Sequence, residues 1–184
     1  MNRPVLNTER LTLRLFEPAD APAVQQLAGS YEVALNTLTI PHPYPEGAAA
    51  EWIASNEKMF EEGKMINLAI IVRDTGEVAG SIGLVLTPPH DKAEIGYWIG
   101  VPFWNRGYAT EAARALIDFG FAECGLNRID AGHFDRNPSS GRVMQKAGMQ
   151  YEGRLRQYIK KWDEYLDVVY YAILRSEWDA AQKR

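Results

Sequence analysis

The N-terminal half of the chain shows two kinds of spacing between apolar residues. Leucine occupies every second position over 11–15, which predicts a half-buried strand. Apolar residues recur at helical spacing over 48–62, which predicts an amphipathic helix. Pro18 and Asp20 are typical of a helix start, so we also expect a helix from there to about Ser30. The segment 37–47 contains three prolines, which exclude regular structure. It is therefore expected to be an ordered surface loop between the two helices.

The rest of the chain continues this mixture of strands and helices. Apolar runs at 66–73 and 78–87 flank an Asp-Thr-Gly turn, which predicts an antiparallel hairpin. The other expected strands cover 92–101, 128–134, 150–159 and 166–174, and further helices run from about 110 to 124 and from 137 to 148. Strands and helices in this order predict an α/β fold with a mixed sheet.

Composition narrows the class of protein. The 184 residues, 46% of them hydrophobic, are expected to form one domain over 1–184. A net charge of −4 argues against a nucleic-acid partner, because phosphate binding rests on clustered lysine and arginine. No run approaches about 20 apolar residues, and residues 1–6 lack a signal-peptide pattern, so we expect a cytoplasmic protein without a membrane partner. Cys124 has no cysteine partner, and the three histidines lack ligand spacing, so no metal is expected.

The segment 93–113 passes from a strand through a short glycine-containing loop into a helix. The first backbone N–H groups of a helix lack intrahelical partners, and the macrodipole adds partial positive charge there. Gly107 and Ala109 have no bulky side chain, so the backbone can approach a ligand closely, and Arg106 can add a charge-assisted contact. The segment therefore predicts a binding site for an anionic phosphate.

Several segments together resemble one family. In order along the chain they are Leu6–Arg14, Ala93–Trp98, Gly107–Ala112, Asn137–Ser140 and Lys146–Gly148. This set resembles the GCN5-related N-acetyltransferase (GNAT) superfamily, and within it the RimJ/RimL-like ribosomal-protein N-terminal acetyltransferases. The resemblance implies a GNAT fold: a mixed, largely antiparallel sheet of about seven strands with a splayed central pair, flanked by about four helices. It also implies acetyl-CoA as co-substrate.

The resemblance assigns residues to acetyl-CoA. The family binds the pantetheine arm on the backbone of the splayed strand, which here implicates Trp98, Ile99 and Gly100. The pyrophosphate would bind Asn105, Arg106, Gly107, Tyr108, Ala109 and Thr110. The family pattern Gln/Arg-x-x-Gly-x-Gly/Ala begins here with Trp104, which cannot donate hydrogen bonds as Gln or Arg would.

Acetyl transfer needs a neutral amine, support for an oxyanion and a leaving thiolate. Glu94, on the strand that would hold the thioester, is the first candidate for the base; the alternative is a strand residue paired with a cross-strand cation. RimL-like proteins have an acidic residue where this chain has Ile159. A backbone N–H near Ile99 is expected to stabilise the oxyanion.

Two polar residues at a helix start are further candidates. The resemblance implies that Asn137 contacts the cofactor and that Ser140 hydrogen-bonds or protonates the departing thiolate. Asn137 is equally suited to cap its helix. Tyr151 and Tyr158 are alternative acids, although aromatic residues in strands are more typical of a core.

The acceptor is the open part of this interpretation. The resemblance favours the α-amine of a protein N-terminus, while a polyamine, amino-sugar or aminoglycoside acceptor and a non-catalytic acyl-CoA-binding regulatory domain are alternatives. An open cleft would favour a peptide, and a closed acidic pocket would favour a small cation. Residues 37–45 lie where the family's acceptor usually binds, or form a rigid connector. Both a monomer and a homodimer fit the aromatic-rich strand at 168–174.

Overall fold

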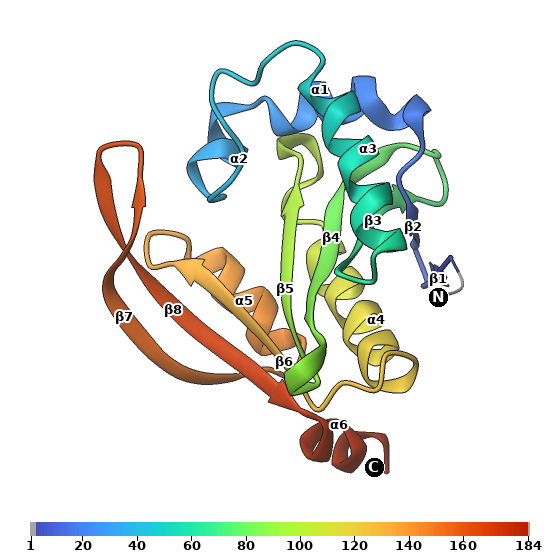
Figure 1. Cartoon of the computed structure of the whole chain (residues 1–184), viewed down its shortest axis with the longest axis vertical. Coiled ribbons are helices and arrows are strands. Elements are labelled where there is room, and N and C mark those ends of the chain that lie inside the picture. The colour runs from blue at the N-terminus through green and yellow to red at the C-terminus, as the bar shows by residue number, and fades with distance from the viewer. Residues whose placement is uncertain (1–2, 184) are drawn as a thin grey trace.

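The structure, a computed structural model, describes residues 3–183. Met1 and Asn2, which belong to the segment 1–6 considered above, and Arg184 lie outside the described residues. A single curved sheet forms the centre of the molecule, with α3 in front of it and α4 and α5 behind it (Figure 1). In the described part of the chain, no helix combines the length and apolar character needed to cross a membrane.

Eight strands and six α-helices make up the described chain. The strands are β1 (Val5–Asn7), β2 (Leu11–Leu15), β3 (Met65–Val72), β4 (Val78–Thr87), β5 (Lys92–Ile99), β6 (Arg128–Phe134), β7 (Gln150–Lys161) and β8 (Glu164–Leu174). The helices are α1 (Ala21–Ala28), α2 (Tyr31–Leu35), α3 (Ala48–Glu61), α4 (Tyr108–Ala122), α5 (Pro138–Lys146) and α6 (Arg175–Gln182). Short 3-10 turns are η1 (Pro18–Asp20), η2 (Pro88–His90) and η3 (Val101–Phe103).

The predicted α/β class is confirmed, and the predicted counts are slightly low. The additional strand, β1, has three residues, too few to show a period in the sequence. Of the additional helices, α2 has five residues and is capped by Ser30, whose Oγ accepts a hydrogen bond from the Val33 N–H. The other, α6, follows β8 directly, and the Glu177 carboxylate accepts from the Leu174 N–H at its start.

The strand order is β1-β2-β3-β4-β5-β6-β8-β7, and every neighbouring pair is antiparallel except β5 and β6. These two parallel strands pair over three residues, ending at Glu94 and Asp130. Beyond Glu94 the strands diverge, and α5 packs against β6 on one side of the opening. The mixed, largely antiparallel sheet with a splayed central pair is thus confirmed.

The divergence leaves backbone groups of β5 without a strand partner. The Gly100 N–H donates to the Ala79 oxygen on β4 at 2.9 Å. Counting back from Gly100, every second residue of β5 therefore also directs its backbone N–H and C=O groups toward β4. The intervening residues, Ile95, Tyr97 and Ile99, direct theirs toward the side from which β6 has moved away. This exposed edge is the first element of the site.

Both faces of the sheet are covered by apolar packing. Leu116, Ile117 and Phe121 of α4 are buried in the larger core cluster. Val24 of α1 and Ile53 of α3 belong to a second cluster on the opposite face. Burying these side chains removes apolar surface from water and holds the sheet between the helices.

A carboxylate on α4 ties the start of that helix to the β1–β2 turn. Glu111 Oε1 accepts from Thr8 Oγ1 at 2.6 Å and from the Arg10 N–H at 2.8 Å, and Oε2 accepts from Arg10 Nε at 2.7 Å. Arg10 Nη1 also donates to the Arg106 oxygen at 2.9 Å. Two segments nearly a hundred residues apart thereby fix the loop that precedes α4.

We predict that Glu111→Ala lowers the free energy of unfolding by about 1–3 kcal/mol, because it removes a charged acceptor and leaves several donors without it. Burial raises the pKa of Glu111, but hydrogen bonds from Thr8 and Arg10 outweigh it, so the net shift is downward. The stabilisation by Glu111 is therefore fully present at a pH above the ordinary glutamate pKa, and it is lost as the pH falls through the lowered pKa of Glu111 in the folded protein.

Urea denaturation followed by circular dichroism at neutral and acidic pH measures this difference. Glu123→Ala, at the exposed C-terminal end of the same helix, is the matched control. Equal stabilities of Glu111→Ala and Glu123→Ala at neutral pH would contradict the proposed tie.

Candidate functional site

The loop between β5 and α4 adopts a conformation that exposes backbone N–H groups. Asn105 has φ of 61° and Gly107 has φ of 81°, and α4 begins immediately afterwards at Tyr108. A Cβ on Gly107 would lie 3.3 Å from a guanidinium nitrogen of Arg10, so both the backbone angle and the space favour glycine. Residues 107–110, at the start of α4, line a cleft, and helix N-termini with unpaired backbone N–H groups are suited to bind anions.

Trp104 makes a hydrogen bond that the sequence interpretation did not foresee. Its indole Nε1 donates to the Ile99 oxygen at 2.7 Å, across the η3 turn. The side chain therefore satisfies a carbonyl at the end of the splayed strand and fixes the loop to it. Trp104 therefore donates its hydrogen bond to the backbone of this protein, whereas a Gln or Arg at this position would be expected to donate to the ligand.

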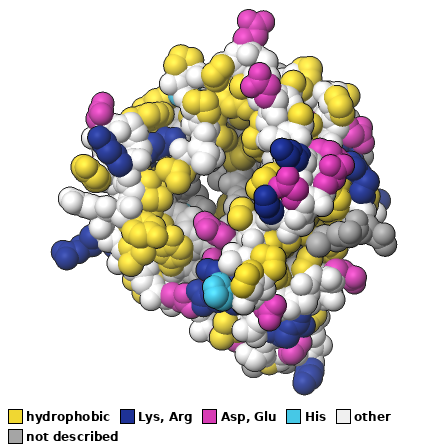
Figure 2. All heavy atoms as spheres, viewed as in Figure 1, with side chains coloured by type: hydrophobic (Ala, Val, Ile, Leu, Met, Phe, Trp, Pro, Cys, Tyr) yellow, Lys and Arg dark blue, Asp and Glu magenta, His cyan; other side chains and the backbone are white. Residues whose placement is uncertain are grey.

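A cleft of about 1120 Å³ passes through the opening between β5 and β6 and reaches both faces of the sheet. Figure 2 shows it as a hollow with acidic side chains near its rim. The predicted site residues that line it are Glu94, Trp98, Ile99, Asn105, Gly107, Tyr108, Ala109, Thr110, Asn137 and Ser140.

Two predicted residues lie elsewhere among the described residues. Gly100 is buried, and a Cβ there would lie 2.6 Å from the Leu27 side chain. Its N–H is already used in the sheet. The Arg106 guanidinium lies over the Phe103 ring, 5.5 Å from its centroid. Arg106 does not line the cleft, although its neighbours Asn105 and Gly107 do.

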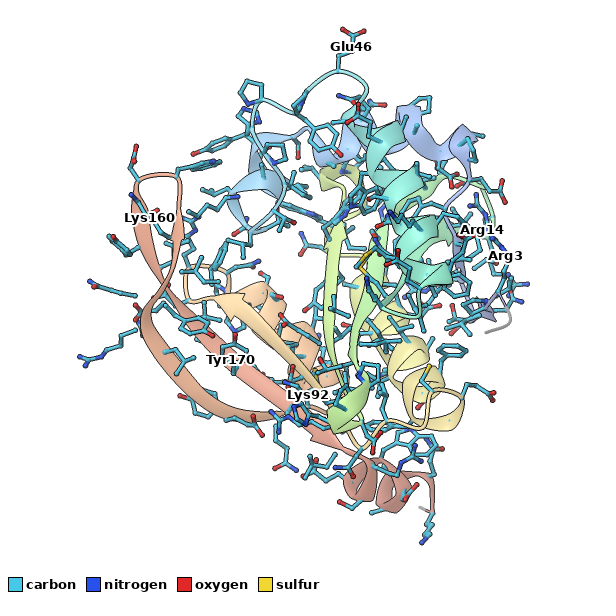
Figure 3. The ribbon with its side chains drawn as sticks, viewed as in Figure 1. Arg3, Arg14, Glu46, Lys92, Lys160 and Tyr170 are labelled. Atoms are coloured by element: carbon cyan, nitrogen blue, oxygen red, sulfur yellow. The ribbon has the colours of Figure 1, made fainter. Side chains whose placement is uncertain are left out.

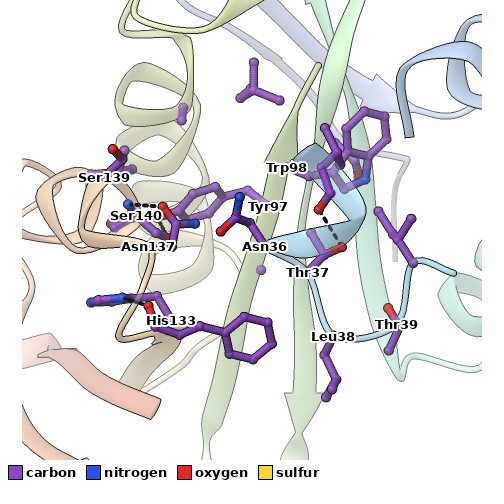
Figure 4. Close-up of a pocket in the computed structure, with 18 of the residues that line it drawn as sticks. Asn36, Thr37, Leu38, Thr39, Tyr97, Trp98, His133, Asn137, Ser139 and Ser140 are labelled. Carbon is purple, nitrogen blue, oxygen red and sulfur yellow. Dashed lines mark hydrogen bonds between the residues drawn. The ribbon is translucent and has the colours of Figure 1, made fainter. Parts of the chain in front are cut away.

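Ser140 and Asn137 meet β5 through Tyr97. The Tyr97 hydroxyl donates to the Ser140 oxygen at 3.0 Å and lies 2.8 Å from Ser140 Oγ (Figure 4). Burial raises the pKa of Tyr97 to about 12, against the opposing effect of the Ser140 hydrogen bond, so the hydroxyl stays protonated. Asn137 Oδ1 accepts from the Ser140 N–H at 3.4 Å, which is the capping geometry considered above. The Tyr97 contact bridges the splayed opening.

Glu94 lies at the point where β5 and β6 separate, with Val85 and Asp130 as its neighbours in the sheet. The alternative of a cross-strand cation partner is not seen in residues 3–183. Partial burial raises the pKa of Glu94, the nearby charge of Asp130 raises it further, and Lys92 opposes both. Figure 3 labels Tyr170 of β8, which lines the cleft, and Lys92, two residues before Glu94 on β5. A carboxylate with a raised pKa is a better proton acceptor than an ordinary glutamate.

The far end of the cleft is enclosed by contacts between segments 31–42 and 136–162. Lys161 is buried, and its Nζ donates to the Leu38 and Ile40 oxygens at 3.2 and 3.3 Å. Trp162 at the tip of the β7–β8 hairpin stacks on Tyr31 with ring centroids 6.0 Å apart. Most of segment 37–45 lines the cleft, and two of its carbonyl groups accept hydrogen bonds from Lys161.

The charge in the cleft is mixed. Glu32 and Glu94 are the acidic residues among the described residues of the lining, which also includes Arg136, Arg142 and Lys146. Ile159 lines the cleft as an apolar residue. In the described part of the chain, no group of three or more metal-ligating side chains occurs.

Sequence reasoning missed Tyr97 and two polar residues inside apolar strands, Asn67 and Ser81, which also line the cleft. A polar residue in the middle of an apolar run was the available signal for the last two. Tyr151 and Tyr158, considered as core residues or acids, are 61% and 56% exposed on β7 and lie outside the cleft lining.

Comparison with known proteins gives consistent matches. Residues 10–150 match the family model of the acetyltransferase (GNAT) domain. The chain is 35% identical to "Uncharacterized N-acetyltransferase p20" of Bacillus licheniformis, covering 94% of this chain and 97% of that protein. It is 30% identical to the "Putative ribosomal N-acetyltransferase YdaF" of Bacillus subtilis, over 93% and 94% of the two. A crystal structure of a GNAT-family acetyltransferase from Bacillus anthracis superposes with a TM-score of 0.84 at 31% identity, covering 94% and 99%.

Proposed function

The chain belongs to the GNAT acetyltransferase family and is an acetyl-CoA-dependent N-acetyltransferase, and from that premise we propose that it acetylates the α-amine of a protein N-terminus. The observation that carries the choice of acceptor is the Glu94 carboxylate, which lines the cleft where β5 and β6 separate. A polyamine brings several positive charges and would meet Arg136, which donates to the Leu35 oxygen on the acceptor side of the cleft. The relationship to the ribosomal-type protein of Bacillus subtilis supports the same choice.

The chain's residues fit acetyl-CoA on one side of the opening. The Gly107 turn and the first N–H groups of α4 offer a cradle for the pyrophosphate. The backbone edge at Ile95, Tyr97 and Ile99 offers hydrogen bonds to the pantetheine arm, and its N–H groups can stabilise the oxyanion.

The proposed chemistry is direct attack of the amine on the thioester carbonyl. An α-amine has a pKa of about 8, so a fraction is protonated at neutral pH and Glu94 accepts that proton. As the carbon–nitrogen bond forms and the carbon–sulfur bond breaks, Ser140 donates a hydrogen bond to the departing thiolate, and the second proton lost by the nitrogen ends on the sulfur, which leaves as the free thiol of CoA. The Tyr97 hydroxyl lies 2.8 Å from Ser140 Oγ and can donate to it in place of the Ser140 carbonyl oxygen, which leaves the Ser140 hydrogen for the thiolate.

Thiol release from acetyl-CoA, measured with peptide N-termini, spermidine and an aminoglycoside, tests the choice of acceptor. We expect release with peptides carrying a free α-amine and little with the same peptides blocked at that amine. Faster release with spermidine than with any peptide would favour the small-molecule alternative. Binding of CoA without release from any acceptor would favour a regulatory role and contradict the proposed chemistry.

We predict that Glu94→Gln lowers kcat about 100-fold or more, because the amide cannot accept the proton. In the wild type, activity should rise with pH as Glu94 ionises, at a pH above the ordinary glutamate pKa. Asp130→Asn should move that rise to lower pH, because it removes a neighbouring negative charge. Steady-state kinetics over pH 4–9 measure both effects; the same pH profile in wild type and Glu94→Gln would exclude Glu94 as the base.

We predict that Gly107→Ala raises the KM for acetyl-CoA about tenfold, because the Cβ strains a φ of 81° and crowds Arg10 beside the cradle. Gly125→Ala is the matched control, since Gly125 also has a positive φ, of 67°, but nothing lies within 4 Å of a Cβ there. The acceptor KM should not change in either variant. Equal effects of the two substitutions on the KM for acetyl-CoA would show that backbone strain alone is responsible.

A further inference from the structure

Asn67 and Ser81 are polar side chains buried within apolar strands on the face of the sheet where the acceptor would lie. Asn67 on β3 is 9% exposed and Ser81 on β4 is 3% exposed. Burying a polar group costs free energy unless it is hydrogen-bonded, so such residues require a partner. Ser81 Oγ donates to Asn67 Oδ1 at 2.7 Å.

The Asn67 amide lies over Gly83 in the direction of β5. A Cβ on Gly83 would lie 2.9 Å from Asn67 Oδ1, so the amide occupies the space that a side chain on β4 would take. Asn67, Gly83 and Gly96 are level with one another on β3, β4 and β5. A Cβ on Gly96 would meet nothing within 4 Å. The floor of the cleft between Asn67 and the opening is therefore bare backbone.

The contact with Ser81 determines which amide group faces the cleft. It occupies Oδ1, while Nδ2 makes no hydrogen bond within residues 3–183. Asn67 thus presents an N–H donor on one side of the bare floor, and Glu94 presents an acceptor on the other. Two strand spacings, about 10 Å, separate β3 from β5, and the asparagine side chain covers part of that span.

We propose that Asn67 determines acceptor specificity by donating from Nδ2 to the carbonyl oxygen adjacent to the acceptor amine. The inference rests on the proposed function, because the amine is the group placed near Glu94. An α-amine in a peptide or amino acid has a carbonyl or carboxylate on the next carbon. A polyamine or a lysine side chain has none there and would leave Nδ2 unpaired, which costs binding.

The test compares two acceptors that differ in one carbonyl group. One is the peptide Ala-Gly-Gly, and the other is its analogue with an alkene in place of the first amide, which keeps the shape and removes the oxygen. Asn67→Asp keeps the size of the side chain and an oxygen for Ser81 but replaces the donor with a carboxylate. We expect it to lower the preference for the peptide over the alkene, measured as the ratio of kcat/KM values, about tenfold. The KM for acetyl-CoA should stay the same.

Two further variants complete the test. Ser81→Ala removes the hydrogen bond that orients the amide and should lower the same ratio by a smaller factor. Asn127→Asp makes the same charge change on the exposed turn before β6, outside the cleft lining, and should leave the ratio unchanged. Free L-alanine, assayed beside the peptide, distinguishes an amino acid from a protein N-terminus as the source of the α-amine.

The outcomes separate this inference from the proposed function. An unchanged ratio in Asn67→Asp and Ser81→Ala, with the peptide still acetylated, would overturn the role of Asn67 and leave the proposed acceptor class intact. Failure of the wild-type protein to acetylate any α-amine, with spermidine acetylated instead, would overturn the proposed function as well.

Discussion

The divergence of β5 and β6 beyond Glu94 is the constraint on which the rest of the site depends. A continuous sheet would pair the backbone groups of Ile95, Tyr97 and Ile99, and its two faces would be sealed from each other. Because pairing stops after three residues, those groups have no partner on β6, although Trp104 Nε1 donates to the Ile99 oxygen, and the cleft passes through the sheet. A thioester bound on one face can then meet an amine that arrives from the other.

The surrounding elements hold this opening in place. On the side of the phosphate loop, Glu111 and Arg10 tie α4 to the β1–β2 turn, and Trp104 ties the loop to the end of β5. Across the opening, Tyr97 contacts the first turn of α5 through Ser140. At the acceptor end, Lys161 attaches the β7–β8 hairpin to the loop after α2. The contacts of Tyr97 and Lys161 join the two sides of the gap, and those of Glu111 and Trp104 hold the loop before α4 on one side of it.

Much of the fold could be predicted from local patterns. The alternating leucines of β2, the proline and asparagine that begin α5, and the Asp-Thr-Gly turn between β3 and β4 each act over a few residues. The short β1 and α2 were missed, because three or five residues show no period. The resemblance to the GNAT family supplied the splayed pair, which no local pattern indicates.

The site residues that sequence reasoning missed depend on contacts between distant segments. Glu111 was part of a recognised motif, yet its role follows from Thr8 and Arg10, about a hundred residues away. Trp104 departs from the family pattern, and its bond to Ile99 depends on the path of the η3 turn. Asn67 has meaning only beside Ser81, Gly83 and Gly96, which the strand register brings together.

A crystal structure with CoA and a peptide acceptor bound together would test most directly whether the thioester and the amine meet at the opening between β5 and β6. We expect the pantetheine arm to pair with the backbone edge of β5 that faces the opening. We expect the peptide's α-amine to lie within hydrogen-bonding distance of the Glu94 carboxylate. An amine that enters from the α4 face, or a pantetheine arm that lies away from the opening between β5 and β6, would contradict this account.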